Sequence, residues 1–302
     1  MKIIDAHAHV LERIAGFGPK GELRPIGNGR ARWASGDEIH MIPDGMGECE
    51  FTCETLISLM DKHKIEKAVL LQGSFYGFQN EYTYEAAKKY PNRFIASGTF
   101  DPFCKEKDKL LERLLNKMEL KVFKFETSSG GGLMGYHNDF AIDGEVFDDI
   151  FSQVAKTGST LVLDIGSPGM GSFQAGAVYN VARKYPDMRI ILCHLLAPTL
   201  RDVSELKNSL EILKLENVWF DLAAVPWNVA PEQYPYNTGR EYIRIAKEIV
   251  GAQKLIWGSD VPSVLTREEY ENLINYITSG NIFTENELDA VFYNNAITAY
   301  PL

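Results

Sequence analysis

The segment KIIDAHAH, residues 2–9, joins a short apolar run to an acid and two histidines, Asp5, His7 and His9. Its length and β-branched residues predict a strand. Side chains two residues apart on a strand point to the same face. We therefore expect these three polar side chains to stand in one row that meets either solvent or something that histidine binds.

Seven further runs of this kind follow, and segments with helical periodicity separate them. They begin at residues 67, 93, 121, 159, 189, 217 and 254. Most lack polar alternation, as is typical of parallel strands that are covered on both faces. No glycine fingerprint for a dinucleotide follows the first run. The sequence predicts an α/β fold, a closed (β/α)8 or TIM barrel, with residues 1–302 forming a single domain.

Two local features refine this prediction. The segment from Leu11 to Cys53 is rich in Gly, Pro and Arg and is longer than a turn requires, so we expect a long loop or lid after the first strand. The last long helix is expected to begin near Thr266, because Glu269 follows at the spacing of a capping box.

Composition excludes several classes of protein. The chain of 302 residues has 31 basic and 41 acidic residues, a net charge of −10 and no long basic run, which argues against nucleic acid as a partner. No apolar stretch is long enough for a membrane helix, and the start of the chain resembles neither a secretory nor a transit peptide. We expect a cytoplasmic protein with four free cysteines, Cys49, Cys53, Cys104 and Cys193.

Polar residues gather where the predicted strands end, which is where active sites lie in TIM barrels. Imidazoles and carboxylates buried without partners are costly, and a divalent cation would satisfy them. The pattern therefore predicts a metal site at this rim, built from a set that comprises Asp5, His7, His9, Lys124, Glu126, Asp164, His194, Asp221 and Asp260.

The segments that carry these residues resemble the amidohydrolase superfamily of metal-dependent TIM barrels, within it the branch that includes aminocarboxymuconate semialdehyde decarboxylase. The likeness extends along the chain in DAHAH, IEKAVLL, KKYPNRFIASGTFDP, CHLLAP, LIWGSDVP and NNAITAYPL. It implies that His7 and His9 are metal ligands and that Asp260 is both a ligand and the group that takes a proton from the attacking water. It also implies that His194 contacts the substrate or the reacting oxygen.

One strand end departs from the family pattern. The branch usually has a metal-binding histidine at the end of the fifth strand, where this chain has Asp164. Asp164 would either ligate, which favours a harder ion such as Mn²⁺, or mark a site that has lost its metal. We expect one divalent ion per chain, Zn²⁺ or Mn²⁺, with Asp164 among its ligands.

Three further strand-end side chains have more than one interpretation. Lys124 and Glu126 share a face and form either a structural ion pair or contacts to a substrate. Asp221 either orients a ligand or caps a loop. Cys193, next to His194, is expected to face the other way and to pack between barrel and helices.

Loop residues supply the remaining candidates for substrate binding. Arg30 and Arg32 would clamp a carboxylate or lie on a solvated loop. His137 would reach the pocket or remain in solvent. Trp227 would form a wall of the pocket or pack against neighbouring helices.

The residues and the resemblance together predict an enzyme that hydrolyses a small carboxylated amide, ester or lactone with metal-activated water. The alternative is a lyase that decarboxylates or hydrates an aromatic or unsaturated acid. A third possibility is a barrel that only binds a metabolite. A homodimer is expected only from its general frequency.

Overall fold

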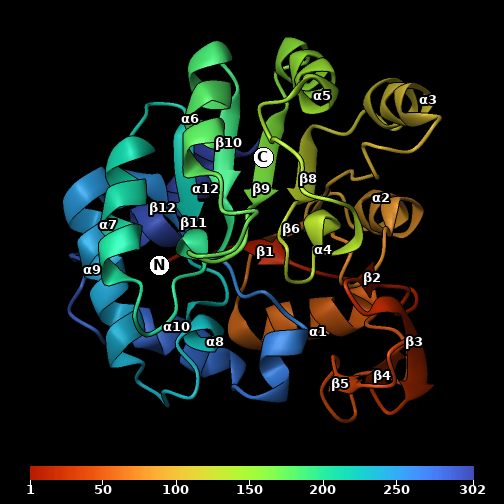
Figure 1. Ribbon diagram of the computed structural model, residues 1–302. Coiled ribbons are helices and arrows are strands. Elements are labelled where there is room, and N and C mark those ends of the chain that lie inside the picture. Colours follow the sequence, from red (N-terminus) through yellow and green to blue (C-terminus); the bar gives the residue numbers. More distant parts are fainter.

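The computed structural model describes residues 1–302 (Figure 1). Parallel strands form two sheets, of order β1-β6-β7 and β12-β11-β10-β9-β8. Along the chain these strands are β1 (Ile4–Ala8), β6 (Lys67–Leu70), β7 (Phe94–Ala96), β8 (Val122–Glu126), β9 (Thr160–Asp164), β10 (Arg189–Leu192), β11 (Val218–Asp221) and β12 (Leu255–Ile256).

The two sheets meet at both of their edges. A parallel bridge between Gly98 and Phe123 joins the end of β7 to β8, and another between Ala8 and Val261 joins β1 to the segment after β12. The ring of eight parallel strands in sequence order is consistent with the predicted (β/α)8 barrel.

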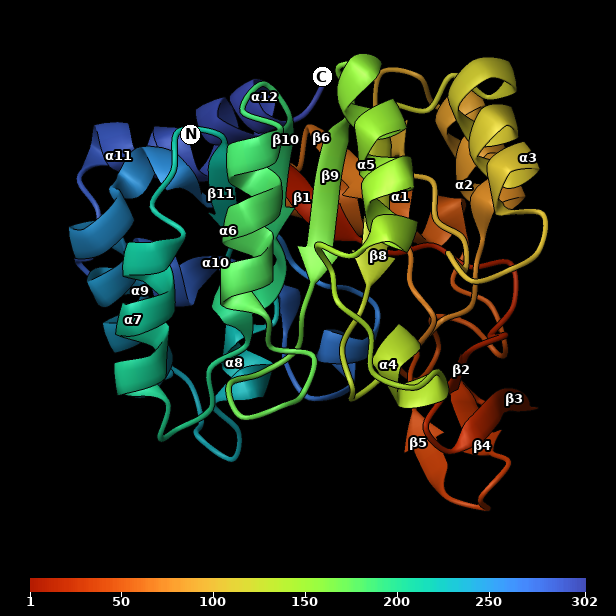
Figure 2. The ribbon, with the colours of Figure 1, turned by 45° about the horizontal axis from the view of Figure 1, so that its top comes forward.

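Helices follow the strands along the chain and lie around their outside (Figures 1 and 2). They are α1 (Cys53–His63), α2 (Asn80–Lys89), α3 (Lys107–Glu112) with the π-helical η1 (Arg113–Lys117), α5 (Glu145–Lys156), α6 (Ala175–Lys184), α7 (Val203–Ile212), α9 (Asn237–Val250) and α10 (Tyr270–Thr278). Shorter elements are α4 (Leu133–Tyr136), η2 (Cys193–Leu196), α8 (Val225–Asn228), η3 (Ala252–Lys254), η4 (Ser263–Thr266), α11 (Glu285–Asp289), η5 (Ala290–Asn294) and α12 (Asn295–Ala299).

Alternation along β8 shows how a strand divides its side chains between two cores. Phe125 points outward and packs on Phe147 and Phe151 of α5, with ring centroids 5.8 and 6.1 Å apart. Val122 instead belongs to a second buried cluster, which we call the inner cluster and which includes Val69, Val162 and Ile191. Lys124 and Glu126 follow Val122 at steps of two, so the same alternation directs them to the interior and its mouth.

The segment after β1 differs from the predicted long loop. It contains a four-stranded antiparallel sheet, which projects from one corner of the barrel in Figure 2. Its strands are β2 (Phe17–Gly18), β3 (Gly21–Gly27), β4 (Arg30–Trp33) and β5 (Glu38–His40). The turn between β3 and β4 is Asn28-Gly29, and both residues have positive φ. Asn-Gly is the strongest short hairpin signal, so the sequence did carry a sign of this sheet.

The start of α10 also differs from the prediction. The hydroxyl of Thr266 donates to the carbonyl of Ser263 at 2.8 Å, and the helix begins only at Tyr270, without a side-chain cap. The segment after β12 is used instead to form η4. A capping box does form later, where Thr284 precedes α11 and exchanges hydrogen bonds with Glu287.

Replacing Thr284 with Ala is expected to lower the free energy of unfolding by about 1 kcal/mol, because the amide of Glu287 loses its acceptor at the start of α11. Chemical denaturation followed by circular dichroism measures this. The exposed Thr298, whose hydroxyl donates to a carbonyl of its own segment, provides the control Thr298→Ala. Equal stability of the two variants would contradict the role of the cap.

Two compositional predictions can be compared with the structure. All four cysteines are free, as predicted. None of the helices combines the length and apolar character that crossing a membrane requires.

Candidate metal centre

The end of β1 supplies two of the three polar side chains predicted to form a row. His7 and His9 both reach Asp260, whereas Asp5 turns away and accepts hydrogen bonds from Ser259 and Tyr270. The pairing of β1 with β6 is irregular between Asp5 and Ala8. This irregularity breaks the period of two, so the prediction that all three share a face is wrong for Asp5.

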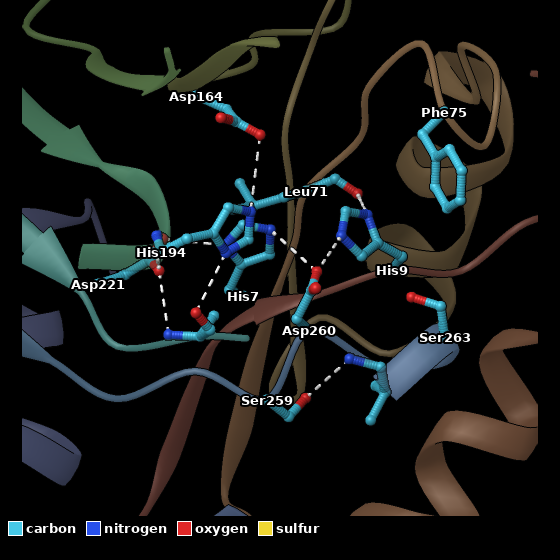
Figure 3. Close-up of polar contacts among 12 residues, drawn as sticks. His7, His9, Leu71, Phe75, Asp164, His194, Asp221, Ser259, Asp260 and Ser263 are labelled. Carbon is cyan, nitrogen blue, oxygen red and sulfur yellow. Dashed lines mark hydrogen bonds and ion pairs between the residues drawn. The ribbon is translucent and has the colours of Figure 1, made fainter. Parts of the chain in front are cut away.

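His7, His9 and Asp260 converge although more than 250 residues separate the histidines from the acid (Figure 3). Oδ1 of Asp260 lies 3.0 Å from Nε2 of His9 and 3.5 Å from Nε2 of His7. Asp260 has a φ of 64°, a conformation that is uncommon for residues other than glycine and that occurs at functional sites.

The outer nitrogens of both imidazoles are already held. Nδ1 of His7 lies 2.9 Å from Oδ2 of Asp221, and Nδ1 of His9 lies 2.9 Å from the carbonyl of Leu71. When these nitrogens carry the protons, the lone pairs of both Nε2 atoms face Asp260. Histidines that bind a metal through one ring nitrogen commonly donate from the other to a carboxylate or a backbone carbonyl, as here, so two imidazoles and one carboxylate fit a divalent ion.

The electrostatics of the three residues agree with this assignment. Burial, followed by the nearby charge of Lys124, lowers the pKa of His7 well below its usual value, and burial lowers that of His9. Burial alone would raise the pKa of Asp260, but its close contact with His9 and the neighbouring imidazoles lower it. Both histidines are therefore neutral and Asp260 is ionised at neutral pH, as ligation requires.

His194 enters the site through a kink after β10. Residues 194–197 all have positive φ, and the backbone amide of His194 donates to Asp221 at 2.8 Å. Its Nε2 lies 3.6 Å from Oδ2 of Asp164, and its ring centroid is 4.8 Å from that of His7. Burial would lower the pKa of His194, but the charges of Asp260 and Asp164 raise it.

Asp164 lies beside His194 rather than within the cluster of His7, His9 and Asp260. Its other oxygen, Oδ1, accepts from the amide of Gly166 at 2.9 Å.

Cys193 does not face away from His194 as predicted. Its sulfur and the ligand nitrogens of His7 and His194 lie within 4.8 Å of one another, and its side chain belongs to the inner cluster with Val162 and Ile191. The strand ends at Leu192 and the left-handed kink follows, so alternation no longer separates the two neighbours.

A cavity of about 150 Å³ lies beside this cluster, at the carboxyl ends of the strands. Its walls include Phe75, Tyr76 and Trp227, and Trp227 stacks at 3.8 Å under the guanidinium of Arg267. The other lining residues are His9, Gly73, Lys124, Glu126, Asp164, His194, Asp260 and Ser263.

Lys124 and Glu126 both reach the cavity but do not form an ion pair with each other. Nζ of Lys124 lies 3.4 Å from Nε2 of His7. Oε2 of Glu126 accepts from the hydroxyl of Ser74 and the amide of Phe75, each at 3.2 Å. Burial raises the pKa of Glu126 to about 7, although the charge of Lys124 opposes the shift. The interpretation as a structural ion pair is therefore wrong.

Three predicted substrate contacts lie elsewhere in this structure. Arg30 and Arg32 are exposed on β4, where Arg32 pairs with Glu38 at 2.6 Å. Nε2 of His137 lies 2.8 Å from Oδ2 of Asp101. None of the three lines the cavity.

Gly73 and Ser263 also line the cavity and were not predicted to do so. A Cβ at Gly73 would stand 2.2 Å from Oε2 of Glu126, so only glycine lets the carboxylate lie where it does. Gly73 directly follows the second strand run and Ser263 comes three residues after Asp260, so position at a strand end was the available signal for both.

Replacing Asp221 with Asn is expected to weaken metal binding about 10- to 100-fold. The amide nitrogen would donate to Nδ1 of His7 and force its proton onto Nε2, the nitrogen that faces Asp260. Competition with a chromogenic chelator measures the affinity, and Asp101→Asn, which alters the partner of His137, is the control. Wild-type affinity in Asp221→Asn would contradict the assigned tautomer.

A family model described as Amidohydrolase matches residues 4–302. No curated protein matches the chain in sequence.

Solved structures match in fold at low identity. A probable 2-pyrone-4,6-dicarboxylic acid hydrolase from Acinetobacter baumannii, solved with citric acid, has a TM-score of 0.72 at 18% identity, with 100% of each chain covered. An amidohydrolase from Burkholderia multivorans with bound zinc has a TM-score of 0.74 at 15% identity, also with 100% of each chain covered. A 2,6-dihydroxybenzoate decarboxylase has a TM-score of 0.59 at 14% identity, with 82% of this chain and 87% of the other covered.

Proposed function

The chain belongs to the amidohydrolase family, and from this premise we propose that it is a metal-dependent hydrolase of a small carboxylated amide, ester or lactone. The observation that carries the proposal is the convergence of His7, His9 and Asp260 with both outer imidazole nitrogens held. An amidohydrolase of the same fold was solved with bound zinc, and for this chain we propose one divalent ion, Zn²⁺ or Mn²⁺.

A divalent ion held by His7, His9 and Asp260 would lower the pKa of water toward ~7 and polarise the carbonyl of the substrate. Asp260 is ionised and reaches the cavity, so it takes the proton of the attacking water and returns it to the leaving group. His194 faces the same cavity and donates a hydrogen bond to the oxygen on which charge develops.

Asp164 is proposed as a further ligand through movement of its side chain, which now contacts His194. The ammonium of Lys124 contacts Nε2 of His7. If this nitrogen bound the metal instead, the ammonium would be free to contact another group. Lys124, Glu126 and Trp227 would then contact the substrate. Arg30, Arg32 and His137 would do so only if their segments move toward the mouth.

A lyase is the second candidate. The observation in its favour is that the cavity holds an ammonium, Lys124, and a carboxyl group, Glu126, beside the same cluster, and a 2,6-dihydroxybenzoate decarboxylase shares the fold. In this reaction the same residues would hold an aromatic or unsaturated acid, and His194 or Asp260 would supply or remove the proton.

The sheet of Phe17–His40 is proposed to act as a lid, with the whole chain as a single domain. It packs beside the cavity through Trp33 and Phe75, whose ring centroids are 6.5 Å apart. Cytoplasmic location and a homodimer remain predictions.

Turnover of a panel separates the two reactions. Carboxylated lactones, esters and amides are incubated with the metal-supplemented enzyme in ¹⁸O-labelled water, and hydroxybenzoates and muconate-type acids are monitored for carbon dioxide. We expect ¹⁸O in a new carboxyl group of the product. Carbon dioxide release without hydrolysis of any panel member would replace the hydrolase by the lyase.

A further inference from the structure

The polar atoms of the cavity define what a ligand must carry. Lys124 is buried, and the only hydrogen-bond partner of its ammonium is Nε2 of His7 at 3.4 Å. The ion pairs of the site join histidines to aspartates and leave this ammonium without a carboxylate. A group with three donors and no anionic partner in a closed site is suited to a carboxylate of the ligand.

Glu126 presents the opposite requirement two residues further along β8. Both of its hydrogen bonds, from Ser74 and from Phe75, go to Oε2. Gly73 and Gly131 lie close against this carboxyl group, and a Cβ at Gly131 would stand 3.2 Å from Oε1. Glu126 is thus held in place with Oε1 still able to accept, so a ligand meets it best with a hydroxyl or another donor.

The charge of the cavity limits how many anionic groups a ligand brings. Glu126, Asp164 and Asp260 are acidic, Lys124 is the only Lys or Arg of the lining, and no arginine is present. With a divalent ion bound, its two charges offset those of Asp260 and Asp164, which leaves the ammonium of Lys124 for an anionic group of the ligand. One carboxylate of a ligand then finds Lys124, but a second would face Glu126 or Asp164, because the imidazole of His194 already faces Asp164.

Shape adds a third requirement. Three of the 11 lining residues are aromatic, Phe75, Tyr76 and Trp227, and a cavity of about 150 Å³ is large enough for benzene. Lys124 and Glu126 stand two residues apart on β8 and so on one face of the strand, which lets one ring present a carboxylate to the first and a hydroxyl to the second.

We propose that this site is selective for a hydroxylated monocarboxylate of single-ring size, with Lys124 binding the carboxylate and Glu126 the hydroxyl, and that it discriminates against dicarboxylates. The proposal rests on the proposed function only in placing the substrate in this cavity. Binding tests it without turnover, so its failure is distinguishable from the failure of the hydrolase assignment.

Three matched probes differ at one ring position: 3-hydroxybenzoate, benzoate and benzene-1,3-dicarboxylate. Calorimetric titration of the enzyme as purified and supplemented with Zn²⁺ is expected to show 3-hydroxybenzoate binding about 10-fold more tightly than benzoate, the gain of one hydrogen bond to a charged group. The dicarboxylate is expected to bind at least about 10-fold more weakly than 3-hydroxybenzoate, since two carboxylates would then meet.

Variants assign each preference to its residue. Glu126→Gln removes the like charge and lets the amide donate, so it should reduce the discrimination against the dicarboxylate to about threefold or less. Lys124→Met should weaken all three probes, and Lys124→Arg should restore part of the affinity. Lys88→Ala, on the exposed face of α2 where Lys88 pairs with Glu85, is the control that should change none, and thermal denaturation verifies folding of each variant.

The proposal is overturned if the dicarboxylate binds the wild type as tightly as 3-hydroxybenzoate does. It is also overturned if Glu126→Gln leaves their ratio unchanged in a folded protein, or if none of the probes binds. Hydrolytic inactivity together with the expected preferences would instead overturn the hydrolase and leave this proposal standing.

Discussion

Replacing Asp260 with Asn is expected to lower kcat/KM about 10² to 10⁴-fold, because the amide cannot take the proton that an ionised carboxylate takes. The carboxylate contacts Nε2 of His9 and of His7 and also reaches the cavity. No other acid of the structure combines these two contacts, since Asp164 approaches His194 instead. Steady-state kinetics with the substrate identified by the panel measures this effect.

The exposed Asp44, which pairs only with His40 at 3.4 Å, provides the matched control Asp44→Asn, with wild-type kinetics expected. Asp164→Asn separates a ligand from a neighbour of His194, because loss of a ligand lowers metal affinity as well as rate. If Asp260→Asn kept more than about a tenth of the wild-type activity, the assigned proton transfer would be wrong.

Replacing Asp5 with Ala is expected to lower the free energy of unfolding by about 3 kcal/mol, the largest effect on stability that we predict. The carboxylate is fully buried. It accepts from the amide and hydroxyl of Ser259, at 2.9 and 2.5 Å, and from the hydroxyl of Tyr270 at 2.8 Å. Truncation would leave these donors without an acceptor in a closed space. Urea denaturation followed by tryptophan fluorescence measures the change.

Asp5→Asn should cost less than Asp5→Ala, since the amide oxygen still accepts from Ser259 and the amide nitrogen can donate to the oxygen of Tyr270. The control is Asp37→Ala, which breaks an exposed pair with Lys20 and should cost under about 1 kcal/mol. An equal cost for Asp5→Ala and Asp37→Ala would contradict the role of Asp5 in joining β1 to the segment that carries Asp260.

The parallel strands and the alternating helices were predictable because each repeats one signal, an apolar run followed by an amphipathic segment. The small sheet at Phe17–His40 was not predicted, since its strands contain few apolar residues and form no apolar run. Only the Asn28-Gly29 turn indicated it. The start of α10 was placed too early because a local spacing at Thr266 and Glu269 fitted a cap that the chain uses differently.

The residues of the candidate site were predictable where they lie at the end of a strand. His194, Lys124, Glu126 and Trp227 line the cavity as expected. Alternation failed where the backbone is irregular, at Asp5 before the irregular pairing and at Cys193 before the kink. The contact of Lys124 was not predictable either. Spacing along β8 suggested Glu126 as its partner, but its ammonium contacts His7, which comes from another strand.

Metal content tests the central claim most directly. Protein purified without added ions, then dialysed against Zn²⁺ or Mn²⁺ and freed of excess, is analysed by inductively coupled plasma mass spectrometry. The structure predicts about one ion per chain in the wild type and less than about a tenth of that in a folded His7→Ala, His9→Ala double variant. Equal metal content in both proteins, or none in the wild type, would contradict a centre built on His7, His9 and Asp260.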